Sequence, residues 1–151
     1  MAKNSVKNDI DNGIGRSVGG NTTKIHMVVD SLGLPIYFEL TGREVHDSKM
    51  AAQLISNSPQ SEYVIADRGY DSNDIRKKVI AENSTPIIPR KNNSKVGNDD
   101  IDWYLYKLRH LIENTFARLK HFRGIATSYD KLKRNFQGML LLACSFIWLP
   151  I

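Results

Sequence analysis

The sequence predicts an α/β fold, a mixed sheet with helices packed on it, and three observations support this. Short apolar segments alternate along the chain with longer segments of helical periodicity, which is typical of a sheet covered by helices. The length of 151 residues corresponds to about one domain. The composition is that of an ordinary globular chain, because 41% of the residues are hydrophobic and 25% are charged.

The elements are expected to follow one another in a simple order. Residues 1–22 are rich in Gly, Ser, Thr and Asn without an apolar period, so we expect a loop leader there, followed by one domain over residues 23–151. Gly33 suits a tight turn between two strand-like segments, which predicts a β-hairpin. The expected strands are 24–30, 35–40, 63–67 and 85–90, and the expected helices are 45–56, 73–82, 100–121 and 131–148.

Polar residues and prolines define the expected ends of these elements. Asp47 or Ser48 opens the first helix, and Asp71 or Ser72 caps the second, since short polar side chains bond the free N–H groups of a first turn. Pro86 restricts its strand to an edge of the sheet or a strand start, because proline lacks the N–H that a central strand donates.

The net charge of +5 comes from one part of the chain. Residues 1–100 carry equal numbers of basic and acidic side chains, whereas residues 101–134 carry eight basic and three acidic ones. This excess favours a polyanion partner, most often nucleic acid, and the alternative is a solvated helix face. The DNA-binding candidates in this stretch include His110, Arg118 and Arg123. A second basic group either contacts DNA or is merely solvated: Arg90, Lys91 and Lys95.

Several classes of protein are excluded by composition. The single cysteine, Cys144, rules out an intramolecular disulfide and a cysteine-based zinc site, and it favours a reducing, cytoplasmic setting. The longest apolar run, residues 139–151, is too short to cross a membrane. The beginning of the chain lacks the apolar core of a signal peptide. We therefore expect no membrane partner.

Asp67 is the first candidate functional residue. It closes an apolar strand just before Gly69, and α/β folds place ligands at the carboxyl ends of strands. Carboxylate oxygens are natural ligands of Mg²⁺. The alternative is that Asp67 only caps the turn.

The long helix predicted at 100–121 carries the other candidates. At 100° per residue, Arg109, Glu113 and Lys120 fall within about 60° of arc around Tyr106, beside an apolar face. A carboxylate among cations suits a metal ligand beside groups that contact phosphate. The alternative is an i,i+4 salt bridge between Arg109 and Glu113 on a wet surface, worth a few tenths of a kcal/mol.

Two motifs resemble those of bacterial insertion-sequence transposases of the DDE type. DRGYD at 67–71 is similar to their second acidic motif. Tyr106, Arg109, Glu113 and Lys120, with gaps of two, three and six residues, are similar to their C-terminal signature. The flanking segments GRSVGGNTTKIHMVVDSLGLPIYFELTG and RHLIENTFARLKHFRGIATSYDKLKRN also resemble this family.

The resemblance implies an RNase-H-like sheet with strand order 3-2-1-4-5 and flanking helices. It implies that Asp67 and Glu113 are the second and third acids, which hold Mg²⁺ or Mn²⁺ in a two-metal site. It also implies that Tyr106, Arg109 and Lys120 contact double-stranded DNA of the transposon end near the scissile phosphate. The implied activity is DNA cleavage and strand transfer at insertion-sequence ends.

The same resemblance implies a first aspartate on a strand that precedes the Gly-rich segment beginning near Ile14. The residues before it include Asp9 and Asp11 but show no apolar alternation. We therefore expect a fold truncated at its N-terminus, without its first strand or first acid, and with an incomplete sheet. Such a chain is expected to be inactive without the missing segment. The upstream-frame product of the same element is then a candidate partner, in an oligomer on DNA.

Two other functions remain open at this stage. One is a non-catalytic DNA-binding remnant that occupies element ends and inhibits transposition. Its DNA binding would weaken with salt, and no cleavage would depend on metal. The other is a stand-alone RNase-H-like nuclease, for which Asp30 is the candidate substitute for the first acid.

Overall fold

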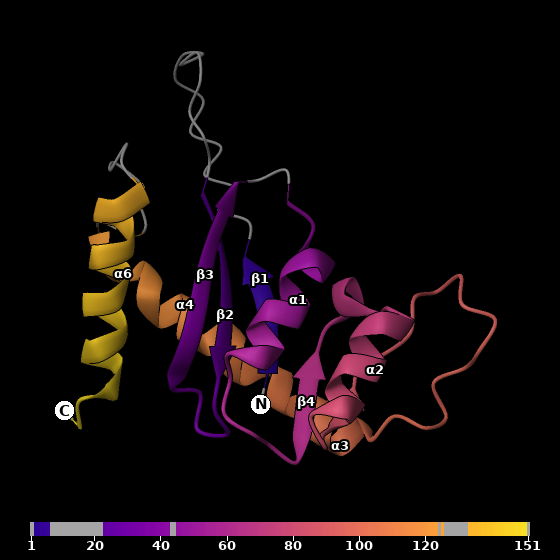
Figure 1. Cartoon of the computed structure of the whole chain (residues 1–151). Helices are drawn as coiled ribbons and strands as arrows, with labels where there is room; N and C mark the ends of the chain where they lie inside the picture. The colour runs from indigo at the N-terminus through magenta and orange to yellow at the C-terminus, as the bar shows by residue number, and fades with distance from the viewer. Residues whose placement is uncertain (1, 7–22, 43–44, 124, 126–132, 151) are drawn as a thin grey trace.

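The computed structural model describes residues 2–6, 23–42, 45–123, 125 and 133–150 (Figure 1). Over these residues the protein is a mixed α/β structure, as predicted. One five-stranded sheet lies between two layers of helices. A separate hydrophobic core fills the space on each face of the sheet.

The sheet has the strand order β3-β2-β1-β4-β5. β1 lies at its centre, antiparallel to β2 and parallel to β4. The two remaining pairs are β2 with β3, which is antiparallel, and β4 with β5, which is parallel. The strands span Ala2–Val6 (β1), Thr23–Val29 (β2), Pro35–Gly42 (β3), Tyr63–Ala66 (β4) and Thr85–Ile87 (β5).

β1 corrects the expectation of a loop leader and of a sheet without its first strand. Residues 2–6 pair with β2 on one side, and Ala2 and Lys3 also pair with β4 on the other, so β1 joins the two neighbouring strands. The segment AKNSV is not a strong strand sequence. Pairing with β2 along the whole segment, and with β4 at Ala2 and Lys3, gives its backbone groups partners and outweighs its weak propensity. Asp9, Asp11 and the rest of the predicted leader lie outside the described residues.

Two helices cover one face of the sheet. α1 (Asp47–Ser56) packs on β2 and β3, and α2 (Asn73–Ala81) packs beside it and on β5. Ser72 caps α2 as predicted, because its hydroxyl accepts from the N–H of Asp74. Asp47 and Ser48 do not cap α1, since His46 precedes the helix and offers no side-chain bond. Asp47 is instead the first residue of the helix.

The other face is covered by a segment that we expected as one helix over residues 100–121. It consists of α3 (Trp103–Tyr106), the 3₁₀ turn η2 (Lys107–Arg109) and α4 (His110–Lys120). Because a 3₁₀ turn advances about 120° per residue, the predicted arc does not hold across η2. α4 packs on β1 and β2, and its buried residues Ile112, Phe116 and Leu119 fill the larger core.

The last helix, α6 (Lys133–Trp148), packs on β3 and α4 and contributes Phe136 and Leu140 to the same core. It agrees with the predicted helix, of which residues 131 and 132 lie outside the described residues. Within the part of the chain that the structure describes, no helix is both long and apolar enough to span a membrane.

The predicted hairpin of β2 and β3 is confirmed. Gly33 has a φ of +80°, in the left-handed region that glycine adopts without strain. Its carbonyl accepts a 2.5 Å hydrogen bond from Thr115 Oγ1, which fastens α4 to the hairpin. Pro86 lies in β5, which is an edge strand as predicted.

Candidate active site

Asp67 follows β4 directly, where the chain turns into η1 (Arg68–Tyr70). Its Oδ1 accepts a 2.8 Å hydrogen bond from the N–H of Gly69, so Asp67 does cap the turn. Tyr70 is buried and anchors the turn in the smaller core. A Cβ on Gly69 would lie only 2.9 Å from Asp67 Oδ1, so a side chain there would displace the carboxylate.

The electrostatic surroundings of Asp67 come from both helical layers. Burial raises the pKa of Asp67 above its ordinary value, and the N–H of Gly69 opposes this rise. The carboxylates of Asp47 and Glu113 raise the pKa further, whereas the Arg109 guanidinium lowers it. Asp67 therefore lies within electrostatic range of Arg109 and Glu113, two of the residues predicted to share its site.

Tyr106, Arg109 and Glu113 form one connected group. The Arg109 guanidinium lies 5.8 Å from the centre of the Tyr106 ring. Its Nη1 lies 2.7 Å from Oε1 of Glu113, so these two residues do form the i,i+4 ion pair considered above. η2 packs against β4 and β1, which brings Arg109 to the side of the sheet where Asp67 stands.

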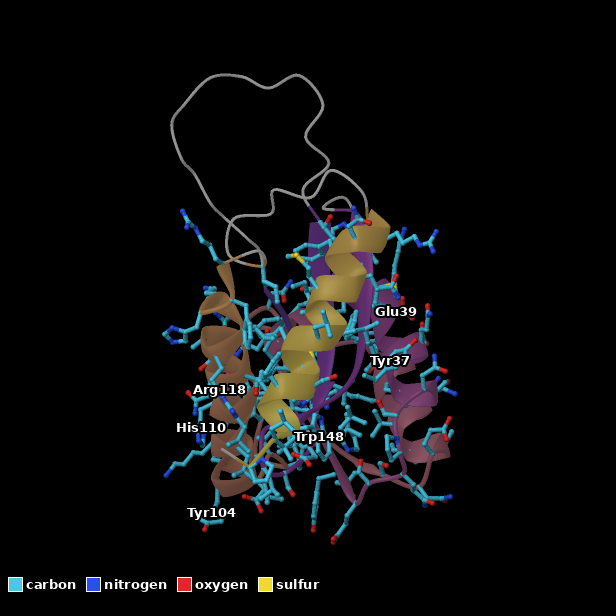
Figure 2. All side chains as sticks on the ribbon, turned by 90° about the vertical axis from the view of Figure 1, so that its left-hand side faces the viewer. Tyr37, Glu39, Tyr104, His110, Arg118 and Trp148 are labelled. Atoms are coloured by element: carbon cyan, nitrogen blue, oxygen red, sulfur yellow. The ribbon has the colours of Figure 1, made fainter. Side chains whose placement is uncertain are left out.

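The remaining predicted DNA-binding residues do not converge on Asp67. Lys120 lies seven residues beyond Glu113, about 10 Å along α4, and is exposed. Figure 2 shows His110 and Arg118 pointing outward from α4. His110 Nδ1 is 2.6 Å from the carbonyl oxygen of Lys107. Arg123 is exposed beyond the end of α4. These side chains therefore continue the polar surface along α4, away from Asp67 and Glu113.

The described residues contain no group of three His, Cys, Asp or Glu side chains that could hold a metal ion. Asp30, considered as a substitute acid, is used elsewhere. Its Oδ1 accepts from the N–H groups of Leu32 and Leu34 at 2.8 and 2.9 Å, within the hairpin turn. Asp30 is also displaced from Asp67 along the strand direction, because it follows Val29, which pairs with Ala2 on β1.

The register of β1 identifies the backbone position beside Asp67. Lys3 pairs with Ala66 in the parallel β1–β4 ladder. One residue further along both strands, position 4 falls beside position 67. Residue 4 is an asparagine. The position in the sheet that adjoins Asp67 on β1 therefore carries an amide rather than a carboxylate.

A buried cluster of charged residues between β2 and the start of α1 was not predicted from the sequence. Lys24 and His26 on β2 are 8% and 0% exposed. The Lys24 ammonium forms an ion pair with Asp47, the first residue of α1. His26 Nδ1 lies 3.8 Å from Asp47 Oδ1, and its Nε2 lies 2.7 Å from Thr41 Oγ1. Burial lowers the pKa of His26, although the Asp47 carboxylate opposes this.

The cluster reaches the turn after β4, because Asp47 Oδ2 lies 3.7 Å from the place of a Cβ on Gly69. A signal for it was present in the sequence. Lys24 and His26 are two residues apart in a strand, so they point to the same face. That face carries α1, whose first residue is Asp47.

The second aspartate of the DRGYD motif has a different role. Asp71 Oδ1 accepts a 2.8 Å hydrogen bond from Arg76 Nη2, and its Oδ2 accepts one from the N–H of Lys91, also at 2.8 Å. Burial acts to raise the pKa of Asp71, but these bonds outweigh it and leave the pKa below its ordinary value. Asp71 thus fixes the loop after β5 to the turn that holds Asp67.

Comparison with known proteins places the chain in a family. Residues 14–148 match the family of transposase DDE domains, so the chain belongs to this family. It is 38% identical over 128 residues to a Brucella ovis protein named as a transposase for insertion sequence element IS6501. That alignment covers 85% of this chain and 98% of the relative.

A second relative, from Burkholderia cepacia, is named as a transposase for insertion sequence element IS402. It is 29% identical over 136 residues, and the alignment covers 83% of this chain but only 62% of that protein. No solved structure matches the chain.

Proposed function

We propose that this chain binds DNA at insertion-sequence ends and supplies two carboxylates for DNA cleavage and strand transfer. The observation that carries the proposal is the placement of Asp67, at the carboxyl end of β4, within electrostatic range of the Arg109–Glu113 pair. The two relatives, both named as insertion-sequence transposases, support the same function.

The sheet supports an RNase-H-like fold. Its first three strands form an antiparallel meander, and β4 and β5 then continue the sheet in parallel with β1. The resulting order, 3-2-1-4-5 in chain numbering, is the one implied by the family resemblance. Asp67 follows β4, and Glu113 comes from a helix packed on β1 and β2.

The side chains fit a hard divalent cation. Asp67 and Glu113 would hold Mg²⁺ or Mn²⁺, whose preferred ligands are carboxylate oxygens together with substrate phosphate. Bound ions of this kind activate the attacking oxygen and stabilise the leaving oxygen of an in-line displacement at phosphorus. Burial raises the pKa of Asp67. A cation bound near the carboxylate would oppose this rise and favour the ionised form.

The cations of the same segment would bind the DNA backbone. Arg109 can grip a phosphate with two N–H groups, whereas Lys120 offers a point charge. In the structure Arg109 is paired with Glu113 and lies over the Tyr106 ring, so it is already oriented before DNA arrives. Side chains on the outer side of α4, such as His110 and Arg118, would contact phosphates further along the duplex.

We also infer that the chain by itself cleaves DNA much more slowly than a transposase with three acids. The described residues contain no group of three His, Cys, Asp or Glu side chains that could hold a metal ion, and position 4 beside Asp67 is an asparagine. The same observation favours a second candidate function. In that case the chain occupies element ends without cleaving them and blocks an intact transposase.

One experiment tests the proposal. Purified full-length chain is titrated onto a duplex that carries the terminal sequence of its insertion element, and binding and nicking are measured with Mg²⁺ or Mn²⁺. We expect salt-sensitive binding and slow, metal-dependent nicking that Asp67→Asn and Glu113→Gln both abolish. Binding without any nicking would support the second function. Nicking unchanged in both variants, or no DNA binding, would contradict the proposed site.

A further inference from the structure

We propose that the loop of residues 91–96 is a second DNA-binding surface, in which Lys91 and Lys95 contact backbone phosphates of DNA that extends past Asp67. The proposal rests on the proposed function, since it assumes that DNA lies at Asp67. Figure 1 shows the segment between α2 and α3 standing out from the body of the protein beside α2. Residues 91–96 are all exposed.

The loop is held in one arrangement by bonds at its two ends. Arg90 forms an ion pair with Asp100, in which Nη2 lies 2.7 Å from Oδ2, and its Nη1 donates to the carbonyl oxygen of Gly97 at 2.7 Å. The N–H of Arg90 donates to Asn98 Oδ1 at 2.7 Å. Together with the bond from Lys91 N–H to Asp71, these contacts close the loop on itself. Little conformational entropy is then lost when a ligand binds.

The structure separates the basic residues of this region into two groups. Arg90 is neutralised by Asp100 and Arg76 by Asp71, so both guanidinium groups serve the framework of the loop. By contrast, none of the hydrogen bonds or ion pairs among the described residues engages the ammonium group of Lys91 or Lys95. Both lysines are exposed, and the Lys91 ammonium also lies within electrostatic range of the Asp71 carboxylate, which is already paired with Arg76.

The loop borders a hollow of about 320 Å³ that suits a polar, anionic ligand. Its lining includes Ser72, Asn73, Lys91 and Asn93, together with the ion pair of Asp71 and Arg76. Hydroxyl, amide and ammonium groups of this kind provide most protein contacts to DNA phosphates and sugars. The hollow therefore has the chemistry of a backbone contact, without the base-reading geometry that sequence recognition needs.

Hydrogen bonds link the turn that holds Asp67 directly to the 91–96 loop. Arg68, which follows Asp67 directly, donates a 2.6 Å hydrogen bond from Nη1 to Asn92 Oδ1. Asp71, at the end of the same motif, accepts from the N–H of Lys91. A duplex whose phosphate lies at Asp67 would therefore pass within reach of this loop. α4 and the 91–96 loop would then contact DNA from two separate segments of the chain.

The test compares two double variants with the same change in net charge. Lys91→Gln/Lys95→Gln removes the proposed contacts, and Lys77→Gln/Lys78→Gln removes two lysines from the later part of α2. Binding of the element-end duplex is measured at several salt concentrations. We expect the loop variant to bind about 2- to 25-fold more weakly, from two surface interactions. The slope of log K against log[salt] should become less steep by roughly 0.9 for each phosphate that the variant no longer neutralises.

The control variant should match wild type in affinity and in salt dependence. Equal behaviour of the two double variants would overturn the proposal. Both should keep a melting temperature close to that of wild type, since Lys77, Lys91 and Lys95 are exposed and the ion pair of Lys78 with Glu82 is worth only a few tenths of a kcal/mol. If wild type does not bind DNA at all, the proposed function fails as a whole. If wild type binds and nicks DNA but the loop variant is indistinguishable from it, only this inference fails.

Site-specific crosslinking gives an independent readout. Cys144 is buried, and burial raises the pKa of its thiol to about 12, so this native thiol reacts poorly with thiol reagents at neutral pH. A photoreactive group can therefore be attached to Asn93→Cys in the otherwise unaltered chain. We expect this protein to crosslink to the duplex and Gln60→Cys, in an exposed loop elsewhere, not to do so. Absence of crosslinks from position 93 would contradict the proposal.

Discussion

The N–H of Gly69 donates a 2.8 Å hydrogen bond to Asp67 Oδ1, and the same oxygen lies 2.9 Å from where a Cβ on Gly69 would stand. Glycine at position 69 thus both holds the carboxylate and leaves it room. The turn gives Asp67 its position without any contribution from α4. Substitutions in this small region should therefore affect metal binding and stability in distinct ways.

Gly69→Ala should impair metal binding far more than folding. The added methyl group would push the Asp67 carboxylate away, and loss of such orientation typically costs about 10- to 100-fold in metal affinity. Calorimetric titration with Mn²⁺ measures the affinity. Gly97→Ala is the matched control, because its Cβ would meet Asp99 Oδ2 at 3.4 Å, a contact that needs little adjustment. Equal Mn²⁺ affinity in the two variants would disprove the role given to Gly69.

Asn4→Asp should strengthen the site. Position 4 falls beside position 67 in the register of β1 and β4, next to the candidate acid in the sheet. A third carboxylate there should raise Mn²⁺ affinity by roughly tenfold or more, since affinity rises with the number of charged ligands. It should also speed nicking of element-end DNA.

Ser5→Asp is the control for this gain, because it adds the same charge one residue further along β1. If Asn4→Asp and Ser5→Asp behave alike in the Mn²⁺ titration and in the nicking assay, the register does not define the site.

The two aspartates of the DRGYD motif should affect stability in opposite directions. Burial raises the pKa of Asp67, so the folded state binds its proton more tightly and loses stability as pH rises above about 3.8. Asp67→Asn should therefore raise the melting temperature at pH 7, by roughly 1–3 °C because the side chain is partly exposed. This gain should vanish in acid.

For Asp71 the sign is reversed. Hydrogen bonds from Arg76 and Lys91 overcome burial and lower the pKa of Asp71, so it stabilises the fold above pH 3.8 and less as pH falls. Asp71→Asn should lower the melting temperature at pH 7, and the loss should shrink in acid. Melting curves from pH 3 to pH 7 measure both variants. Shifts of the same sign at pH 7 would contradict the assigned surroundings.

Removing Asp47 should destabilise the fold more than removing its ion-pair partner Lys24. Lys24 is buried, whereas the Asp47 side chain is 23% exposed and lies in the first turn of α1. Asp47→Ala leaves a buried ammonium with no carboxylate and only the Val45 carbonyl, 3.3 Å away, and should destabilise the fold by about 2–3 kcal/mol. Lys24→Met leaves a carboxylate at a helix N-terminus, where it is favourable, and should cost about 1 kcal/mol or less. Urea unfolding measures both, and equal costs would contradict this account.

Much of the fold could be predicted because the relevant signals are local. Gly33, Ser72 and Pro86 act within a few residues of their own positions, and the hairpin, the cap of α2 and the edge strand are where they indicate. The exception is β1. Its segment AKNSV carries little apolar pattern, and only pairing with β2 and β4, distant in sequence, makes it a strand.

The sequence indicated candidate site residues but not how the structure arranges them. The spacing of Arg109 and Glu113 correctly anticipated an i,i+4 ion pair. The arc calculated for a continuous helix does not hold across η2, because residues 107–109 form a 3₁₀ turn. Lys24, His26 and Asp47 were missed since their contact joins a strand to a helix 21 or more residues away.

By itself, the sequence determined the family, the alternation of strands and helices, and the identity of Asp67 and Glu113 as candidate acids, because each rests on residue types at fixed spacings. The tertiary structure decided which elements meet. It made residues 2–6 the central strand, brought the Arg109–Glu113 pair within range of Asp67, and bound the 91–96 loop to the same turn through Asp71. These are contacts between distant segments, and their free energy depends on packing and burial that no local pattern encodes.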